Sequence, residues 1–389
     1  MSGRRFAVVT AGGTGGHVLP ALEIARALCR RGHSAQSIEI VGSSRGQDLA
    51  LLEGEGFAMS FLPGRGLSRK ADARTILKNV GSVCVLAWAV VLEVVEFVRR
   101  RPKVVVAVGG YGSVPAGVAA LFLRIPIVVV SVDAVPGLAN RLLGRFATAN
   151  AVAFPVERLK RTVVTGTPVR AEISNVVRTK DASVKALKVL GIPECRKTIA
   201  VFGGSLGSLR INEAVVDLVG RWSGREELAI YHVVGKRDWE ELSSELPGDG
   251  GLGDSGIFYR AVAFESRMDL LYTAADLFLC RAGGMTVAEL SVVGCPAILV
   301  PLPGAPGDHQ GANANVLSAV GGAVVLNDDL CDARHLARII DELLGDPKKL
   351  DAMGEAVKSL GRADASDRIG DVVERVARGR HMEVLVGNS

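Results

Sequence analysis

Residues 5–17 read RFAVVTAGGTGGH, in which a short apolar run passes through a glycine-rich turn into a segment with helical spacing. Residues 198–207, TIAVFGGSLG, repeat this arrangement, and the apolar runs 104–108 and 125–131 are likewise followed by turns and helical segments. Continuously apolar strands that alternate with helices are typical of parallel sheets with helices on both faces. We therefore predict an α/β fold of two Rossmann-like halves, with both glycine loops at strand ends that line a cleft between the halves.

The length and composition agree with this prediction. The chain has 389 residues, of which 48% are hydrophobic and 22% charged, so it is a globular chain with room for two domains. Its net charge of +5 and its aromatic content of 5% predict no nucleic-acid partner. The six cysteines form no CxxC pair, and the first apolar run leads directly into a glycine loop, unlike a signal peptide. We expect a protein of the reducing cytoplasm.

Basic residues gather on both sides of one apolar segment. Residues 83–92 read VCVLAWAVVL, and ten apolar residues are too few for a transmembrane helix, which needs about 18 to 20. Glu93 and Glu96 then interrupt the run. Because residues 65–78 and 99–103 are rich in Lys and Arg, the segment fits a helix that lies on anionic lipid, and equally a helix packed in the core. We expect no transmembrane helix.

The loop before His17 fits an anionic ligand. Glycines let the backbone of residues 13–16 approach a ligand closely, and the N–H groups that open the next helix favour a diphosphate or a developing anion. The loop is neither a dinucleotide fingerprint nor a P-loop, because Val18 breaks the GxGxxG spacing and no GK[ST] follows. His17 could deprotonate a hydroxyl nucleophile or hold a phosphate. A tight strand-to-helix turn with a structural histidine is the alternative.

Polar side chains in the second half fit a nucleotide sugar. Ser205 lies in the second glycine loop and offers a hydroxyl to phosphate oxygens. Glu289 closes a strand–glycine–helix stretch and could accept hydrogen bonds from a ribose diol, whereas a glutamate on a helix surface is the alternative. Gln310 and Asn313 follow a loop rich in proline and glycine and suit sugar hydroxyls. No carboxylate pair is spaced for glycoside hydrolysis, and no DxD metal motif is evident.

Six segments, taken in order, carry a resemblance to a known family. They are AGGTGGH at 11–17, VGGYGS at 108–113, TGTPVR at 165–170, GGSLGSLRIN at 203–212, CRAGGMTVAE at 280–289 and DHQGANA at 308–314. Together they resemble the MurG family of bacterial UDP-N-acetylglucosamine transferases, from residue 6 to about residue 345. The resemblance implies the GT-B glycosyltransferase fold, with an acceptor and membrane domain at 1–165, a donor domain at 166–345 and C-terminal helices and tail at 346–389.

The resemblance implies an inverting hexosyl transfer. N-acetylglucosamine (GlcNAc) would pass from UDP-GlcNAc to the C4 hydroxyl of MurNAc in undecaprenyl-diphosphate-MurNAc-pentapeptide (lipid I), giving lipid II for peptidoglycan synthesis. UDP-GlcNAc is then a substrate, and we expect no cofactor and no essential metal. The implied partners are lipid I, anionic inner-leaflet phospholipid through residues 65–103, and other cell-wall enzymes. The implied location is the cytoplasmic face of the cell membrane, with peripheral attachment.

The same resemblance assigns roles to individual residues. His17 is the candidate base, and Asp133, where the family has asparagine, is its rival. The implied substrate-binding residues are, for the acceptor, Thr14, Gly15 and Gly16; for the donor diphosphate, Arg170 and Ser205; for the uridine, through main chain, Glu265, Gly284, Met285, Thr286, Val287 and Ala288; for the ribose, Glu289; for the transferred sugar, Gln310 and Asn313; and, at further family positions, Asn140, Asn212 and Arg281.

Several family positions differ in this chain. The HEQN segment that follows the third strand reads VSVD at 130–133, so its asparagine becomes an aspartate, which accepts a hydrogen bond but donates none. The glutamine of GGSQG is Leu206, the glutamine of an HQ pair is Val233, and Val114 replaces a glycine. The donor motifs are thus nearly intact, whereas the acceptor motifs have changed.

Two alternatives remain open on the same fold. A UDP-GlcNAc 2-epimerase would need further acid and base carboxylates and has no reason for a basic and apolar segment at 65–103. A non-catalytic protein that binds nucleotide sugars would keep the donor residues and would have lost catalysis through the changes at 130–133. Turnover of the donor separates the enzymes from the binding protein.

Overall fold

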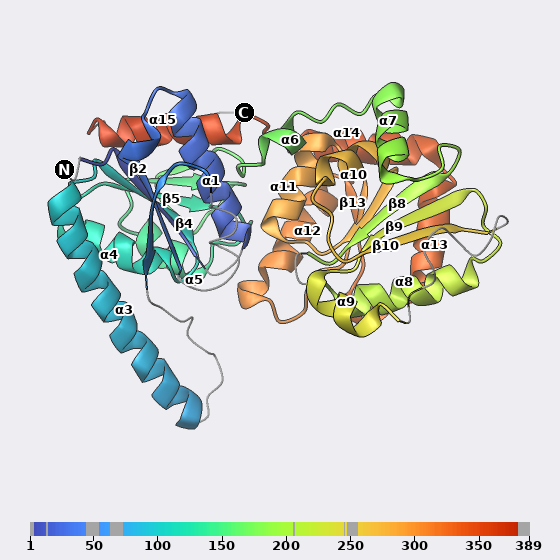
Figure 1. Ribbon diagram of the computed structural model, residues 1–389, viewed down its shortest axis with the longest axis horizontal. Helices are drawn as coiled ribbons and strands as arrows, with labels where there is room; N and C mark the ends of the chain where they lie inside the picture. The colour runs from blue at the N-terminus through green and yellow to red at the C-terminus, as the bar shows by residue number, and fades with distance from the viewer. Residues whose placement is uncertain are drawn as a thin grey trace. The chain divides into compact units, whose positions relative to one another are not determined.

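A computed structural model of the protein describes residues 4–12, 15–43, 54–62, 73–204, 207–244, 246 and 256–379 (Figure 1). The chain divides into two compact units. Unit 1 comprises Met1–Arg170 and Asp364–Ser389, and unit 2 comprises Ala171–Ala363. Each unit contains a parallel sheet, which confirms the predicted pair of α/β halves.

The sheet of unit 1 has the strand order of a doubly wound fold. Its described residues form seven strands in the order β3-β2-β1-β4-β5-β6-β7, and neighbouring strands are parallel. The strands are β1 (Ala7–Ala11), β2 (Ile38–Ser43), β3 (Ala58–Leu62), β4 (Val104–Gly109), β5 (Ile127–Ser131), β6 (Ala149–Val152) and β7 (Thr162–Val164). The order reverses between β1 and β4, and such a reversal opens a crevice at the carboxyl ends of the two strands.

Alternate residues of these strands face two helical layers. Val9 and Val106 pack with α1 and α15, whereas Val8 and Val105 pack with α3, α4 and α5. Because both faces are buried, the strands read as continuous Val and Ala runs. The helices of the unit are α1 (Gly15–Arg30), α3 (Ala73–Arg100), α4 (Ser113–Phe122), α5 (Leu138–Gly144) and α15 (Ala365–Ala377), with the short η1 (Ala35–Ser37).

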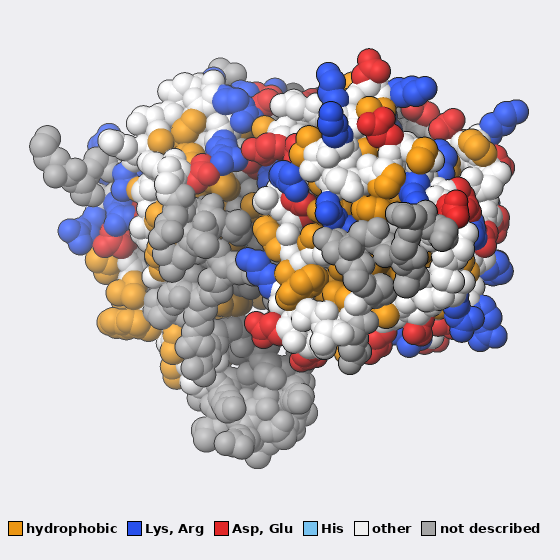
Figure 2. Space-filling view, turned by 45° about the vertical axis from the view of Figure 1, so that its right-hand side comes forward, with side chains coloured by type: hydrophobic (Ala, Val, Ile, Leu, Met, Phe, Trp, Pro, Cys, Tyr) orange, Lys and Arg blue, Asp and Glu red, His pale blue; other side chains and the backbone are white. Residues whose placement is uncertain are grey.

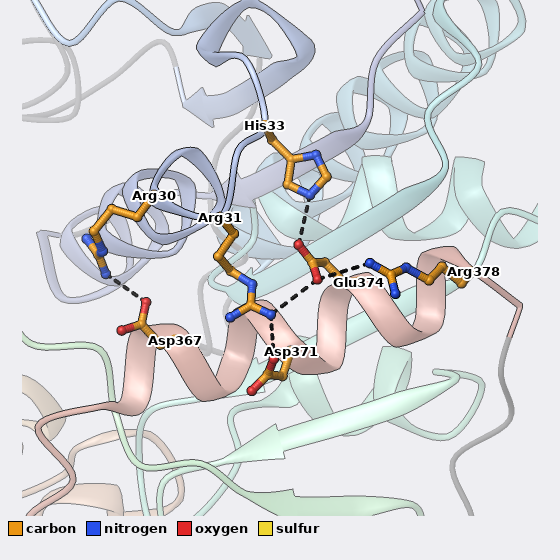
Figure 3. Close-up of polar contacts among 7 residues, drawn as sticks. All are labelled: Arg30, Arg31, His33, Asp367, Asp371, Glu374 and Arg378. Atoms are coloured by element: carbon orange, nitrogen blue, oxygen red, sulfur yellow. Dashed lines mark hydrogen bonds and ion pairs between the residues drawn. The ribbon is translucent and has the colours of Figure 1, made fainter.

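Helix α15 follows unit 2 in sequence but packs against α1 in unit 1 (Figure 3). Its buried apolar face joins the core beside α1, and charged side chains surround that contact. Glu374 forms an ion pair with Arg31 at 3.2 Å and a hydrogen bond with His33 at 3.0 Å, and Arg31 also pairs with Asp371. The tail that we expected at 346–389 is therefore divided, because α14 belongs to unit 2 and α15 to unit 1.

The sheet of unit 2 repeats this pattern. Its described residues form six parallel strands in the order β10-β9-β8-β11-β12-β13, with the reversal between β8 and β11. The strands are β8 (Lys197–Phe202), β9 (Leu228–Val233), β10 (Phe258–Val262), β11 (Leu277–Cys280), β12 (Ala297–Leu299) and β13 (Ala323–Val325).

Helices cover this second sheet, and a large apolar core joins its strands to α8 and α13. The helical elements are α6 (Ala171–Ser174), α7 (Lys180–Leu190), α8 (Leu209–Arg221), α9 (Lys236–Leu242), α10 (Met268–Ala274), α11 (Gly284–Val293), η2 (Pro306–Asp308), α12 (His309–Ala319), η3 (Asp328–Leu330), α13 (Ala333–Leu344) and α14 (Pro347–Lys358).

The units divide after Arg170, later than the expected boundary at 165/166. The main-chain N–H of Thr165 donates to the carbonyl of Val152 at 3.0 Å, and the Thr167 hydroxyl donates to the carbonyl of Val132 at 3.3 Å. These hydrogen bonds tie the Gly- and Pro-containing segment to unit 1. The segment is therefore the end of the first unit as well as the start of a linker.

Helix α3 presents a longer apolar surface than the sequence count suggested. Within the residues that the structure describes, Gly81–Arg100 is long and apolar enough to cross a membrane by length and composition. Glu93 does not interrupt its outward face, because this side chain is only 3% exposed and lies near Glu39 of β2. The apolar surface of α3 therefore extends beyond the ten-residue run at 83–92 that the sequence analysis counted (Figure 2). Its exposed residues are Val83, Val85, Trp88, Val91, Leu92, Val95 and Val98.

Candidate functional site

The reversal point of the unit 1 sheet brings a glycine turn against the first loop. Gly109 and Gly110 have φ of +127° and +73°, which side chains other than glycine rarely adopt. A Cβ at Gly110 would lie 1.9 Å from the carbonyl oxygen of Gly12, and a Cβ at Gly109 would lie 2.7 Å from Cδ2 of His17. The β4 turn can therefore approach the β1 loop and the His17 ring only because both positions are glycine.

Two of the expected residues meet beside this turn. His17 lies in the first turn of α1, and Asn140 lies on α5 with its Nδ2 3.4 Å from the position of a Cβ on Gly109. The Asn140 Nδ2 donates to the carbonyl of Val130 at 3.0 Å, and the buried Oδ1 has no hydrogen-bond partner within the described structure. Asp133 follows the end of β5, next in the sheet to β4, and is half-buried. All three therefore belong to one edge of the sheet.

Part of the expected acceptor and donor set cannot be placed. Thr14 and Ser205 lie outside the described residues, as does Leu206. Gly15 and Gly16 open α1, whose first N–H groups have no partner inside the helix. Arg170 is half-buried at the last residue of unit 1 before the division.

The second glycine loop leads β8 into α8. Gly204 and Gly207 have φ of +101° and +93°, and the N–H of Gly207 donates to the carbonyl of Gly204 at 3.0 Å. A Cβ at Gly203 would lie 2.4 Å from the backbone nitrogen of Ser208, so the backbone at Gly203 lies close to the start of α8. This places the N-terminus of α8 at the carboxyl end of β8, where its N–H groups favour an anion.

Glu289 occupies the corresponding place on the neighbouring strand. It lies in the second turn of α11, which begins at Gly284 directly beyond β11, and its side chain is 8% exposed. The hydroxyl of Tyr272 donates to its Oε2 at 2.9 Å. Burial and the neighbouring carboxylate hold the pKa of Tyr272 well above its usual value, so this hydroxyl stays protonated. The Tyr272 hydroxyl thus fixes the Oε2 atom of Glu289 in place. Helix α11 also contains the expected positions Met285, Thr286, Val287 and Ala288.

Glu265 is held by its own surroundings. Its Oε2 accepts from the hydroxyl of Tyr231 at 2.6 Å, and its Oε1 accepts from the main-chain N–H of Arg267 at 2.8 Å. Burial favours the neutral acid, but the hydrogen bonds from Arg267 and Tyr231 outweigh it and keep the pKa of Glu265 below its ordinary value. The Glu265 carboxylate is thus held in place by groups of the protein.

Three residues expected to bind substrate instead bond to protein groups. Asn212 and Asn313 are wholly buried, and the Asn313 Nδ2 donates to the carbonyl of Ala282 at 3.0 Å. Arg281 is buried and donates to the carbonyl of Val300 at 3.1 Å and to the Asp328 carboxylate at 2.5 Å. Arg281 directly follows β11, whereas Asn212 lies on α8 and Asn313 on α12, and the side chains of all three hydrogen-bond to protein groups.

Gln310 lies in the first turn of α12, and its Oε1 accepts from the main-chain N–H of Leu302 at 3.0 Å. Gln310 is half-buried and thus partly accessible to solvent, whereas Asn313 is wholly buried. Within the described ranges, no three His, Cys, Asp or Glu side chains gather as metal ligands. Sequence reasoning missed Tyr231 and Tyr272, because each lies far along the chain from the glutamate that it holds.

Comparisons with known proteins agree with this arrangement. The glycosyltransferase family 28 N-terminal domain matches residues 7–152, and the glycosyltransferase family 28 C-terminal domain matches residues 198–369. The UDP-N-acetylglucosamine--N-acetylmuramyl-(pentapeptide) pyrophosphoryl-undecaprenol N-acetylglucosamine transferases of Desulforudis audaxviator and Streptomyces coelicolor are 35% and 36% identical to the chain. Each comparison covers 95% of this chain and 98% of the relative.

Solved structures show the same similarity. The crystal structure of Acinetobacter baumannii MurG matches with a TM-score of 0.71 and 26% identity, over 95% of this chain and 99% of that one. A UDP-N-acetylglucosamine 2-epimerase of Neisseria meningitidis, bound to UDP-GlcNAc, matches with a TM-score of 0.58 and 13% identity, over 95% of this chain and 100% of that one. At that identity the second likeness is one of fold alone.

Proposed function

Because this chain belongs to the MurG family of UDP-GlcNAc transferases, with the GT-B fold of glycosyltransferase family 28, we propose that it transfers GlcNAc from UDP-GlcNAc to lipid I and so forms lipid II. The observation that carries the proposal is the identity of 35% and 36% to transferases of this name over 98% of their length. The chain is a hexosyltransferase, and its product serves peptidoglycan synthesis.

We assign the donor to the carboxyl ends of β8 and β11 in unit 2. Helix α8 begins after β8 and helix α11 begins after β11, and these two strands are neighbours in the sheet. The N–H groups at the starts of both helices suit the diphosphate of UDP. Ser205 and Arg170 are proposed as further ligands of the diphosphate. Glu289, whose Oε2 accepts a hydrogen bond from Tyr272, is proposed to accept hydrogen bonds from the ribose hydroxyls.

The remaining donor contacts follow from the same placement. The main chain of Glu265 and of residues 284–288 is proposed to border the uridine, and Gln310 to bind the hydroxyls of GlcNAc. Asn212, Asn313 and Arg281 act on these contacts through the loops that their buried side chains hold.

The acceptor is assigned to the edge of the unit 1 sheet that holds His17. Thr14, Gly15 and Gly16 are proposed to line it, and His17 to take the proton from the C4 hydroxyl of MurNAc. The hydroxyl oxygen attacks the anomeric carbon of GlcNAc as the bond to UDP breaks, so the configuration inverts. Negative charge grows on the leaving diphosphate, where the N–H groups of α8 stabilise it. Asp133 is the second candidate for the base.

Membrane attachment is assigned to α3. Its outward face exposes valines and Trp88, the last of these to 59%, and the basic residues at and just beyond its C-terminal end are Arg99, Arg100, Arg101 and Lys103. Apolar burial and attraction to anionic headgroups add in such a helix. We propose peripheral attachment to the cytoplasmic face of the membrane, where lipid I is the acceptor.

No specific feature of the site favours the two alternatives. The likeness to 2-epimerases is one of fold at 13 to 16% identity, whereas the likeness to transferases includes the sequence. The non-catalytic alternative rests on the changes at 130–133, where the aspartate at position 133 still provides a hydrogen-bond acceptor.

The proposal is tested by radiolabel transfer from UDP-GlcNAc to a short-chain lipid I analogue, with and without EDTA. We expect labelled disaccharide lipid in both reactions, because the helix N-termini and Arg170 supply the positive charge that the leaving diphosphate needs. Binding of UDP without any transfer would contradict the enzyme assignment. Transfer that stops in EDTA would contradict the stabilisation by protein groups.

A further inference from the structure

A wholly buried histidine in unit 2 takes no part in the mechanism described above. His232 lies on β9 with its Nδ1 2.9 Å from the hydroxyl oxygen of Tyr259 and its Nε2 3.0 Å from Oδ1 of Asn212. Burial lowers the pKa of His232 to about 3, so the ring is neutral at physiological pH. A neutral ring has one donor and one acceptor nitrogen, and its neighbours determine which is which.

The direction of each hydrogen bond follows from Asn212. Its Nδ2 donates to the carbonyl of Val234 and to Oδ2 of Asp238, both at 3.0 Å, so its Oδ1 faces the ring as an acceptor. The Nε2 of His232 therefore carries the hydrogen, and Nδ1 accepts from the hydroxyl of Tyr259. Burial raises the pKa of Tyr259, which keeps that hydroxyl protonated. The order of donation is Tyr259, His232, Asn212, Asp238.

Asp238, the last member of this series, and Val234, which also accepts from Asn212, pack against Gly207 of the second glycine loop. A Cβ at Gly207 would lie 2.4 Å from the carbonyl oxygen of Val234 and 2.5 Å from Oδ2 of Asp238. These are the two acceptor atoms that Asn212 holds. Gly207 precedes Ser208 and the start of α8. The position of the loop is thus set by atoms whose own positions depend on Asn212 and His232.

We infer that the hydrogen-bonded series Tyr259–His232–Asn212–Asp238 positions Gly207 and Ser208 at the end of the second glycine loop, and through them the diphosphate of the donor. The inference rests on the proposed function, because it takes the ligand of that loop to be a nucleoside diphosphate. A buried polar network is often no more stable than well-packed apolar side chains of the same volume. Its advantage here is geometric, since it fixes the loop at one distance from β9 and β10.

The neighbouring residue on β9 provides a matched control. Successive residues of a strand point to opposite faces, and Tyr231 accordingly donates to Glu265 rather than to this network. Both tyrosine and histidine are buried, and each supports one loop at the carboxyl edge of the sheet. A change at Tyr231 disturbs the same buried strand on its other face and leaves the support of Gly207 in place.

The experiment compares the affinities for UDP and for uridine, measured by calorimetry and by ligand-observed NMR. The Kd for uridine divided by the Kd for UDP measures how much the diphosphate contributes to binding. We expect His232→Phe to lower this ratio by about tenfold or more, because a displacement of about 1 Å at a binding group is costly. His232→Gln keeps a donor and an acceptor and should restore most of the ratio. Tyr231→Phe should leave the ratio unchanged.

Gly207→Ala supplies an independent variant that keeps His232 and its partners. Its Cβ would push the loop away from the same two acceptor atoms, so the ratio should fall as it does for His232→Phe. This variant decides the question if His232→Phe does not fold. A normal ratio in Gly207→Ala, or in folded His232→Phe, would overturn the positioning role. A wild-type protein that binds uridine as tightly as UDP would overturn the donor site itself, which distinguishes the two failures.

Discussion

Replacing Glu289 by alanine should weaken the binding of UDP while the protein stays folded. Glu289 is 8% exposed, and the hydrogen bond that Tyr272 donates to its Oε2 orients the carboxylate that we propose as the ribose ligand. Hydrogen bonds to a charged acceptor contribute about 1.5 to 3 kcal/mol each. A loss of about 2 to 3 kcal/mol corresponds to roughly a 30- to 150-fold rise in Kd.

The substitution also has a cost for folding that can be separated from binding. In Glu289→Ala the wholly buried hydroxyl of Tyr272 loses its acceptor, which costs about 1 to 3 kcal/mol. The expected fall in Tm is about 2 to 10 °C. Tyr272→Phe removes the same hydrogen bond but keeps the carboxylate, so it should bind UDP within about fivefold of the wild type.

Calorimetry with UDP and 2′-deoxy-UDP completes the assay. If Glu289 binds the ribose, loss of the 2′-hydroxyl weakens the wild type by roughly tenfold and hardly affects Glu289→Ala, because the two changes remove the same interaction. Equal losses in both proteins would refute the ribose assignment. Unchanged UDP affinity in Glu289→Ala would refute it as well.

Three further predictions concern the unit 1 residues. Burial raises the pKa of Glu93 from 4.5 to about 7, so between these pH values the folded state keeps a proton that the unfolded state loses. The free energy of unfolding should therefore fall by up to about 3 kcal/mol as the pH rises from 4.5 to 7, and urea unfolding of Glu93→Gln should lack this dependence on pH. Trp88→Asp with Val95→Asp should reduce binding to anionic vesicles severalfold without changing UDP affinity, and unchanged vesicle binding would remove α3 from the membrane contact. His17→Ala should lower kcat by about 10²- to 10⁴-fold at unchanged UDP affinity, and a larger loss in Asp133→Ala would make the aspartate the base.

The parts of the fold that the sequence predicted are those encoded locally. An apolar run followed by glycines and a helical segment specifies a strand, a turn and a helix within about 25 residues, as at 5–17 and 198–207. Because parallel strands with two buried faces are apolar throughout, the repeats also indicated the doubly wound sheets. The order of the strands in each sheet depends on which segments pair, and no single segment of sequence contains that information.

The parts that the sequence did not predict depend on pairings between distant segments. The sequence predicted α15 only as part of the C-terminal helices and tail, since its buried face is complete only beside α1. Glu93 looked like a break in an apolar run, because the inward side of α3 is defined by the sheet beneath it. Asparagines at family positions looked like ligands, but Asn212 is wholly enclosed by β9 and α9. Motif position therefore predicts where a residue lies better than what its side chain contacts.

The most direct test of the central claim is NMR analysis of the products from UDP-GlcNAc, with and without a lipid I analogue. We predict that UDP is released only with the acceptor, and that the product carries GlcNAc on the C4 oxygen of MurNAc with inverted anomeric configuration. Formation of UDP-N-acetylmannosamine from the donor alone would show an epimerase. Unreacted donor in the presence of acceptor, with UDP binding intact, would show a binding protein.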